Sequence, residues 1–238
     1  MFPSKYEGLP VTEINKRAYY YKHPSFTEII ISDGIESIGV DAFYACKNLR
    51  SVVMGNGVLS IGTSAFSGCS SLQTVVLSED LQSIGNYAFK SCISLRQIDI
   101  PNNVISIKYS SFANTGITRI IIPESVLIIE HATFSSCSNL VSITLPSGIT
   151  SISYDAFRGC SNLSIVNYCG SEEQWKLIDI SDNGNYPLND ATIVYNYDPA
   201  GELGDQTTEE STKIDTSVET NDVEETPTAG ETETGISE

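Results

Sequence analysis

One apolar pattern recurs about every 23 residues, and this repeat restricts the possible folds more than any other feature of the chain. An apolar residue marks the start of each copy, and the steps between successive markers are 23, 23, 23, 22 and 23 residues. The markers are Ile35, Val58, Leu81, Val104, Val126 and Ile149. A phenylalanine lies eight residues after each marker, and three residues further lies a cysteine in five copies and Thr115 in the sixth. Such regular self-similarity indicates stacked structural repeats.

A single copy would not fold alone. It offers about six large apolar side chains, which contribute roughly 1.5 to 3 kcal/mol each when fully buried. Ordering the backbone costs on the order of 1 to 2 kcal/mol for every residue. Stacked copies share each core layer with two neighbours, so the sequence predicts a solenoid whose coils rise by about 4.8 Å, the spacing of a parallel ladder.

Each coil is expected to contain two extended segments. The pattern LxxVxL, as in residues 72–77, alternates apolar and polar side chains and predicts a strand of a parallel main sheet. The pattern VxSIG predicts a second short extended segment on the opposite side of the coil. The pattern AFxxC that follows predicts a tight helical or 3₁₀ turn leading to the next main strand.

The two ends of the repeat region differ. After residue 168 the period stops, and the chain continues GSEEQWKLIDI. Ser171 and Gln174 have the spacing of a capping box for a short helix, and Trp175 is large enough to cover the last core layer. A final strand is expected at residues 191–196 to complete this cap. No comparable cap precedes residue 11, so we expect the natural chain to extend upstream, where a signal peptide would lie.

Negative charge is concentrated at the C-terminal end of the chain. Residues 1–199 contain 18 acidic and 12 basic residues, a net charge of −6, whereas residues 200–238 contain 12 acidic and one basic residue, a net charge of −11. Few large apolar residues occur in 200–238, which predicts a disordered tail or linker. Lys and Arg are scattered singly, so no nucleic acid partner is expected. No apolar run reaches the roughly 18 residues of a membrane span.

The cysteines are expected to be structural. Five occupy one repeated column in which Thr115 takes the sixth place, a pattern typical of a small core filler rather than a unique nucleophile. Neighbouring column cysteines would be close enough for disulfides, but their parallel Cβ directions favour reduced thiols. His23 and His131 lack the spacing of metal ligands, and no glycine-rich phosphate loop occurs. The sequence therefore predicts no catalytic residue, no metal and no cofactor.

Two aspartates at one repeat position are the nearest approach to a carboxylate pair for glycoside hydrolysis. Asp41 and Asp155 share this position, which in the other copies holds Ser64, Tyr87, Ser110 and Ala132. A catalytic pair would need two acids held across a cleft. The mixture of residue types instead indicates a solvated surface position.

The residues quoted above carry a resemblance to a known family. The unit VLSIGTSAFSGCSSLQTVVLSED, residues 58–80, resembles the BspA-like leucine-rich repeat, which places I-G, A-F, C and L-x-x-I-x-L-P at these offsets. The resemblance covers roughly residues 11 to 168, and GSEEQWKLIDI through ATIVYN resembles the ending common in that family. It implies a mainly β, right-handed solenoid of about seven coils with a parallel sheet on its concave face. It also implies a non-enzymatic extracellular or cell-surface protein that binds proteins or matrix.

The surface expected to bind a partner is the outer side of the main sheet, called here the outer sheet face. The third and fifth residues of each LxxVxL segment point away from the core. The first column is Glu28, Ser51, Thr74, Gln97, Arg119, Ser142 and Ile165, and the second is Ile30, Val53, Val76, Asp99, Ile121, Thr144 and Asn167. Four β-branched apolar residues in the second column would form an exposed patch for protein contact. The alternative is that they reflect only the strand propensity of β-branched residues.

Four segments and two functions are therefore predicted. Residues 1–34 form a degenerate first repeat and a truncated N-terminal end, 35–168 the repeats, 169–199 a capping segment and 200–238 the acidic tail. The first predicted function is a non-enzymatic module that binds a protein or extracellular-matrix ligand through the outer sheet face. The second is a structural spacer or targeting module within a larger surface protein or enzyme.

Overall fold

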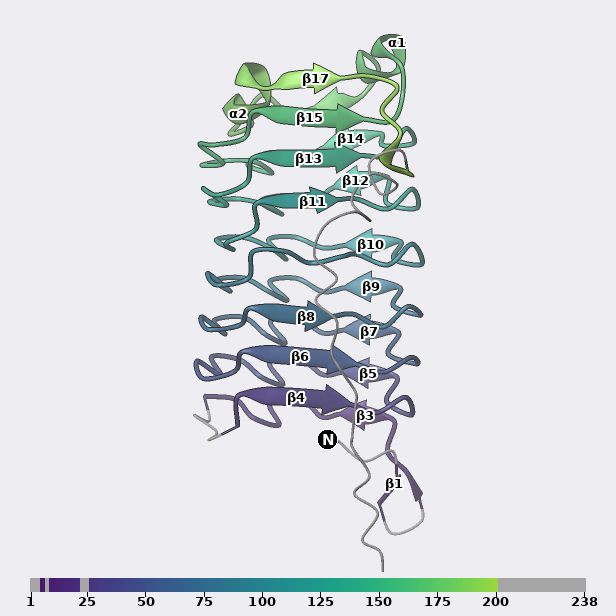
Figure 1. The fold of residues 1–238 in the computed structure, drawn as a ribbon, viewed down its shortest axis with the longest axis vertical. Coiled ribbons are helices and arrows are strands. Elements are labelled where there is room, and N and C mark those ends of the chain that lie inside the picture. The colour runs from purple at the N-terminus through teal and green to yellow at the C-terminus, as the bar shows by residue number, and fades with distance from the viewer. Residues whose placement is uncertain (1–4, 7–8, 22–25, 201–238) are drawn as a thin grey trace, which may run out of the picture.

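The computed structural model describes residues 5–6, 9–21 and 26–200, and these residues form a right-handed solenoid with a parallel sheet along each of two opposite sides (Figure 1). The mainly β fold class predicted from the repeat is confirmed. The described residues make about eight coils rather than seven, because the capping segment continues both sheets. The predicted acidic tail, except for Ala200, lies outside the described residues.

The main sheet faces the viewer in Figure 1, and its strands run from left to right. Its first part consists of β4 (Glu28–Ile31), β6 (Ser51–Met54) and β8 (Thr74–Val76). Its second part consists of β11 (Arg119–Ile121), β13 (Ser142–Leu145), β15 (Ile165–Tyr168) and β17 (Thr192–Val194). All neighbours are parallel and in register, so equivalent positions of successive copies lie side by side. Residues 96–100, at the position between the two parts, are not a regular strand.

The second sheet confirms the prediction for the VxSIG segments. It consists of β3 (Glu13–Ile14), β5 (Ser37–Ile38), β7 (Ser60–Ile61), β9 (Ser83–Ile84) and β10 (Ser106–Ile107), followed by β12 (Ile128–Ile129), β14 (Ser151–Ile152) and β16 (Asp179–Ile180). Pairing stops between β10 and β12, where a shallow pocket of about 250 Å³ is lined by Ile105 and Leu127 among others. Before the first coil, β1 (Lys5–Tyr6) and β2 (Leu9–Pro10) form an antiparallel pair.

The AFxxC segments form the predicted tight turns, each closed by hydrogen bonds between residues three apart, but they contain no helix or 3₁₀ helix. Their backbone bonds both within the coil and to the next coil: the Cys46 amide donates to the Phe43 carbonyl (3.2 Å), and the Phe43 amide to the Ala65 carbonyl (2.8 Å). The residue before each alanine or its equivalent has a left-handed φ of 52° to 57°; these residues are Asp41, Ser64, Tyr87, Ser110, Ala132 and Asp155. This backbone bends each turn so that its amides can reach the neighbouring coil.

The same six residues were predicted to occupy a solvated surface position, and that prediction is wrong. Ser110 and Ala132 are buried, and the other four are only half exposed. The position tolerates varied side chains because backbone hydrogen bonds hold it, for example from the Ser64 amide to the Asn86 carbonyl at 2.8 Å. A non-glycine residue with left-handed backbone costs about 1 kcal/mol, which the ladder between coils offsets.

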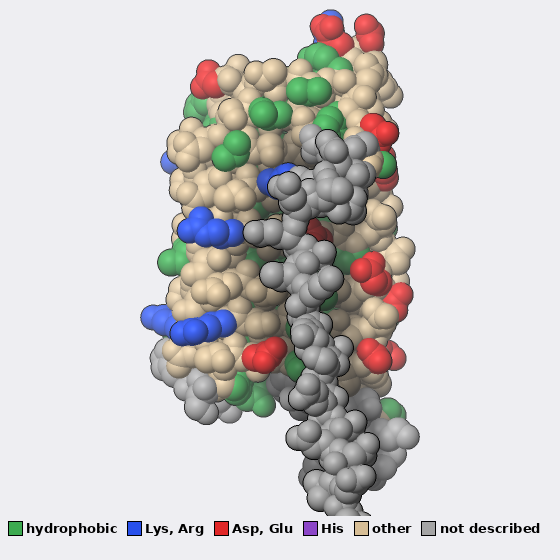
Figure 2. Space-filling view, in the orientation of Figure 1, with side chains coloured by type: hydrophobic (Ala, Val, Ile, Leu, Met, Phe, Trp, Pro, Cys, Tyr) green, Lys and Arg blue, Asp and Glu red, His purple; other side chains and the backbone are tan. Residues whose placement is uncertain are grey.

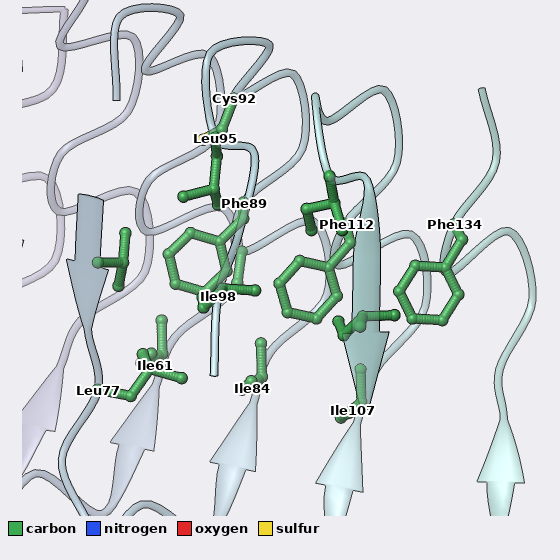
Figure 3. Close-up of a cluster of buried hydrophobic side chains, with 14 of the residues drawn as sticks. Ile61, Leu77, Ile84, Phe89, Cys92, Leu95, Ile98, Ile107, Phe112 and Phe134 are labelled. Atoms are coloured by element: carbon green, nitrogen blue, oxygen red, sulfur yellow. The ribbon is translucent and has the colours of Figure 1, made fainter. Parts of the chain in front are cut away.

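The core between the sheets is a stack of equivalent side chains. The six phenylalanines of the repeated column are completely buried, and successive rings lie parallel with centroids 5.2 to 5.8 Å apart. Figure 3 shows Phe89, Phe112 and Phe134 in this stack beside the isoleucines of the second sheet, such as Ile84 and Ile107. One aromatic ring for each coil therefore forms a continuous column along the solenoid.

The C-terminal end is closed by two short helices. Helix α1 (Glu172–Trp175) begins with the predicted capping box, in which the Ser171 side chain accepts from the Gln174 amide and the Gln174 side chain accepts from the Ser171 amide. Trp175 packs edge-on against Tyr168, with ring centroids 5.2 Å apart. The predicted strand at 191–196 is confirmed as β17, a strand that pairs with β15.

Asn185, directly before helix α2 (Tyr186–Asp190), completes the cap with its side chain, and the repeat pattern did not indicate this role. The Asn185 side chain is buried; its oxygen accepts from the Phe157 amide (3.1 Å), and its amide donates to the Ser153 and Ser181 carbonyls. In the other coils the amide of the phenylalanine bonds to the next turn. Asn185 therefore supplies, from a side chain, the acceptor that a ninth turn would have supplied.

Gly116 adapts the shortest repeat to the solenoid, and we expect Gly116→Ala to lower the free energy of unfolding by about 1 to 3 kcal/mol. The copy that contains it has one residue fewer, so the backbone closes on the preceding turn, and an added Cβ would lie 2.4 Å from the Ile93 carbonyl oxygen. Gly148→Ala is the matched control, because its Cβ would make only ordinary contacts, with the end of Leu127 at 3.5 Å and the Glu124 carbonyl oxygen at 4.0 Å. Urea unfolding of the two variants measures the difference, and equal stabilities would contradict the steric account.

Candidate functional site

The outer sheet face places most of the predicted candidate residues in contact with solvent. In the first column Glu28, Thr74, Gln97, Arg119 and Ile165 are exposed, and Ser51 and Ser142 are half exposed. The parallel register brings the second-column residues side by side, as with Ile30 next to Val53 and Val53 next to Val76. Ile30, Val76 and Ile121 expose between 40% and 49% of their surface, which is high for large apolar residues in a sheet.

The second column is not exposed throughout, because Val53 and Asn167 are half-buried. Thr144 was predicted to be exposed but is buried, because this short side chain lies between the longer Ile121 and Asn167 on the neighbouring strands. Asp99 interrupts the apolar residues in the irregular segment and accepts a hydrogen bond from the Gln97 side chain at 3.3 Å. The exposed apolar residues therefore form two groups, one on the first part of the main sheet and one on the second.

One exposed apolar residue of this face is absent from the predicted columns. Val194 of β17 pairs with Asn167 of β15 and is 40% exposed, so it extends the second column by one coil. The repeat markers stop before it, and only the alternation in ATIVYN, residues 191–196, could have indicated its direction.

The cysteine column lies inside the core and not at a reactive site. Each column thiol donates to the carbonyl of the aromatic residue in the preceding coil, as Cys69 does to Phe43 (3.1 Å) and Cys92 to Phe66 (3.2 Å). Burial raises the pKa of these thiols, in the case of Cys46 to about 11, so the nucleophilic thiolate is disfavoured. Thr115 takes the same place and lies 3.2 Å from the Cys137 sulfur, as expected for an interchangeable small filler.

His131 belongs to a row of surface aromatic residues. Its ring stacks between Tyr109 and Tyr154, with centroids 5.0 and 3.7 Å away, and its Nδ1 lies 2.9 Å from the Tyr154 carbonyl oxygen. Within the described part of the chain, no group of three or more His, Cys, Asp or Glu side chains could hold a metal ion. The same residues include no helix long and apolar enough to cross a membrane.

Comparisons with solved structures show the same architecture in bacterial proteins. The T. pallidum leucine-rich repeat protein TpLRR is 29% identical, with a TM-score of 0.63 over 68% of this chain and 75% of that one. A leucine-rich repeat protein from Bacteroides ovatus is 22% identical, with a TM-score of 0.60 over 82% of this chain. The match spans 62% of the length of the Bacteroides protein. No curated protein matches the chain.

The family comparison covers most of the solenoid. The profile of the BspA-type leucine-rich repeat region matches in six copies over residues 12–127 and 60–177. Proteins of this family and fold are typically non-enzymatic and are generally protein-interaction modules. The matched range includes every Phe and Cys of the repeated columns. The chain therefore belongs to the BspA-type leucine-rich repeat family.

Proposed function

We propose that this protein binds a protein or matrix ligand through the outer sheet face, as a non-enzymatic recognition module at the cell surface or outside the cell. The observation that carries this proposal is the lateral register of exposed β-branched residues, Ile30 and Val76 on one part of the sheet and Ile121 on the other. These apolar side chains stand on a rigid framework, so binding would not require them to be ordered first.

Strand propensity alone does not account for this exposure. The equivalent position of the regular strand β15 holds Asn167, so the framework accepts a polar residue there. Burying Val76 and Ile121 against a partner would remove apolar surface from water at about 25 cal/mol for each Å². An extended face of this kind suits a folded protein better than a small molecule, which would need a concave pocket.

The test is binding of the purified protein to immobilised extracellular-matrix proteins, with the double variant Val76→Asp/Ile121→Asp. We expect the variant to bind at least about tenfold more weakly, because charged carboxylates would replace two apolar contacts. The matched control is Ile105→Asp/Leu127→Asp, which changes two exposed apolar residues directly before strands of the second sheet, 62% and 50% exposed. If both variants bind as the unchanged protein does, the outer sheet face is not the binding surface.

The alternative is a spacer or targeting module in a larger polypeptide. The composition of residues 200–238, rich in Thr, Glu and Gly, supports a linker there. A full gene sequence that places an enzyme or anchor domain after Glu238 would favour the spacer, and a signal peptide before Met1 would support the extracellular location.

A further inference from the structure

The two ends of the main strands carry opposite charges. Besides Arg158, which pairs with Asp155, five basic residues lie in or just after the turns that lead into these strands. They are Lys47, Arg50, Lys90, Arg96 and Arg119, called here the basic edge. The turns at 44–50, 90–96 and 113–119 that contain them include no Asp or Glu. Figure 2 shows Lys and Arg side chains gathered on the left of this view, where the strands begin.

Three of the loops that follow the main strands are acidic. They contain Asp33, Glu79, Asp80 and Glu124, which are all exposed and are called here the acidic edge. The loops at 32–35, 78–81 and 123–126 include no Lys or Arg. In Figure 2 most Asp and Glu side chains lie on the right, where the strands end. The outer sheet face is therefore bordered by positive charge on one side and negative charge on the other.

None of the five cations of the basic edge forms an ion pair among the described residues. The recorded pairs involve other cations: Arg17 with Asp41, Lys108 with Glu130, Arg158 with Asp155 and Lys176 with Glu172. The Lys90 ammonium lies 5.0 Å from the centroid of the Tyr87 ring, a contact that leaves its charge uncompensated. Because four of the five side chains are well exposed, a partner could reach them without displacing an internal carboxylate.

The charges within one edge lie close enough to act together, and the two edges lie far enough apart to act separately. The basic edge extends over about four coils, roughly 15 Å at the spacing of a parallel ladder, so several of its charges lie within about one Debye length of each other. A main strand with its flanking residues spans five to six positions, roughly 16 to 20 Å, which is about two Debye lengths at physiological salt. An approaching partner therefore meets two separate fields of opposite sign.

We propose that the protein ligand of the outer sheet face presents an acidic segment to the basic edge, so that the charge asymmetry fixes the direction in which the ligand lies across the strands. This proposal rests on the proposed function and names the charge of the partner for that same face. A folded protein can place acids at one border and bases at the other. A uniformly anionic polymer, such as a nucleic acid or sulfated glycan, would be repelled by the acidic edge wherever it extended across the sheet.

Fluorescence anisotropy with a labelled peptide of ten glutamates tests the basic edge in the full chain. Arg50→Gln/Arg96→Gln/Arg119→Gln is expected to weaken peptide binding by about tenfold at low salt, because three of the five free cations are lost. Lys16→Gln/Lys108→Gln/Lys176→Gln is the matched control, with the same change in net charge at other places, and should weaken it less than about twofold. Equal losses in the two triple variants would overturn the proposal.

Carbodiimide cross-linking followed by mass spectrometry identifies the occupant. We expect Lys47 and Lys90 to couple to the glutamate peptide more than Lys16, Lys108 and Lys176 do. Coupling of Lys47 and Lys90 mainly to carboxylates of residues 201–238 would overturn the proposal in favour of the chain's own acidic tail. Tighter binding of heparin than of the peptide, lost in the arginine variant, would overturn it in favour of a sulfated polymer.

These outcomes are separate from those of the proposed function. The peptide carries no apolar side chain, so its binding does not depend on Val76 or Ile121. If the peptide binds as expected and the matrix-protein test fails, the basic edge is retained and the apolar face is rejected. If the arginine variant and the control bind the peptide equally, the proposed charge-directed orientation is rejected, whatever the result of the matrix-protein test.

Discussion

Raising the pH from 8.5 to 10.5 in the presence of a reductant is expected to unfold this protein without heat or denaturant. Five thiols are buried in one column, and burial raises the pKa of each above its ordinary value. In the unfolded chain each thiol would ionise near pH 8.5. The folded chain therefore retains protons that the unfolded chain releases, and high pH favours the unfolded state.

The sign and size follow from proton linkage. Because the pKa is raised in the folded state, the stability that these thiols contribute is complete below about pH 8.5 and is lost as the pH rises towards the folded pKa, about 11 for Cys46. The Cys46 thiol alone therefore reduces the free energy of unfolding by about 1.4 kcal/mol for every pH unit in this window, and the raised pKa of the other four buried thiols acts in the same direction. A typical domain has only about 5 to 15 kcal/mol in total.

Circular dichroism during a pH titration, with urea unfolding at each pH, measures this loss. The matched variant is Cys69→Thr, which introduces the residue that Thr115 already provides in the same column. We expect its free energy of unfolding to fall less steeply with pH, because one of the five buried thiols is missing. A free energy of unfolding that stays constant between pH 8.5 and 10.5 would show that the thiols are not protected by burial.

The column residues also show which parts of the structure were predictable from sequence. A buried column must be filled in every coil, so Phe89, Cys92 and their equivalents recur at a fixed step and reveal the period, the two strands and the core. The turn geometry was not predictable in this way. Residues as different as Tyr87 and Ala132 share a left-handed backbone that is held by hydrogen bonds between coils. Because these bonds join backbone atoms, they do not require a particular residue type.

The parts of the surface that sequence missed have a related cause. Asn185 occurs once, so no repetition singles out its buried amide. The cations Arg50 and Arg96 are 46 positions apart in sequence and looked isolated, but the solenoid brings them within two coils of each other. Side-chain exposure at Thr144 depends on the lengths of its neighbours on adjacent strands, which the alternation within one strand does not describe.

Replacing Phe89 by alanine is expected to lower the free energy of unfolding by about 3 to 5 kcal/mol, the usual cost of emptying a buried aromatic position. Phe89 is completely buried, and its ring stacks on Phe66 at 5.4 Å and on Phe112 at 5.5 Å. The cavity would open in the middle of a column whose rings support each other on both sides. The surrounding coils cannot collapse into it, because parallel ladders and turn bonds fix their spacing.

Two comparisons separate the loss of volume from the loss of stacking. Phe89→Leu keeps most of the apolar volume and should cost only about 1 to 1.5 kcal/mol, the part that depends on ring contacts. Tyr19→Ala removes the ring that stacks on Phe43 at 5.4 Å in the first coil, where the residue is only half buried, so it should cost less than Phe89→Ala. Urea unfolding followed by circular dichroism gives all three values. In a solenoid each coil contacts only its neighbours, so a central vacancy weakens two interfaces and a terminal one weakens a single interface. Equal losses for Phe89→Ala and Tyr19→Ala would mean that the aromatic column does not couple the coils.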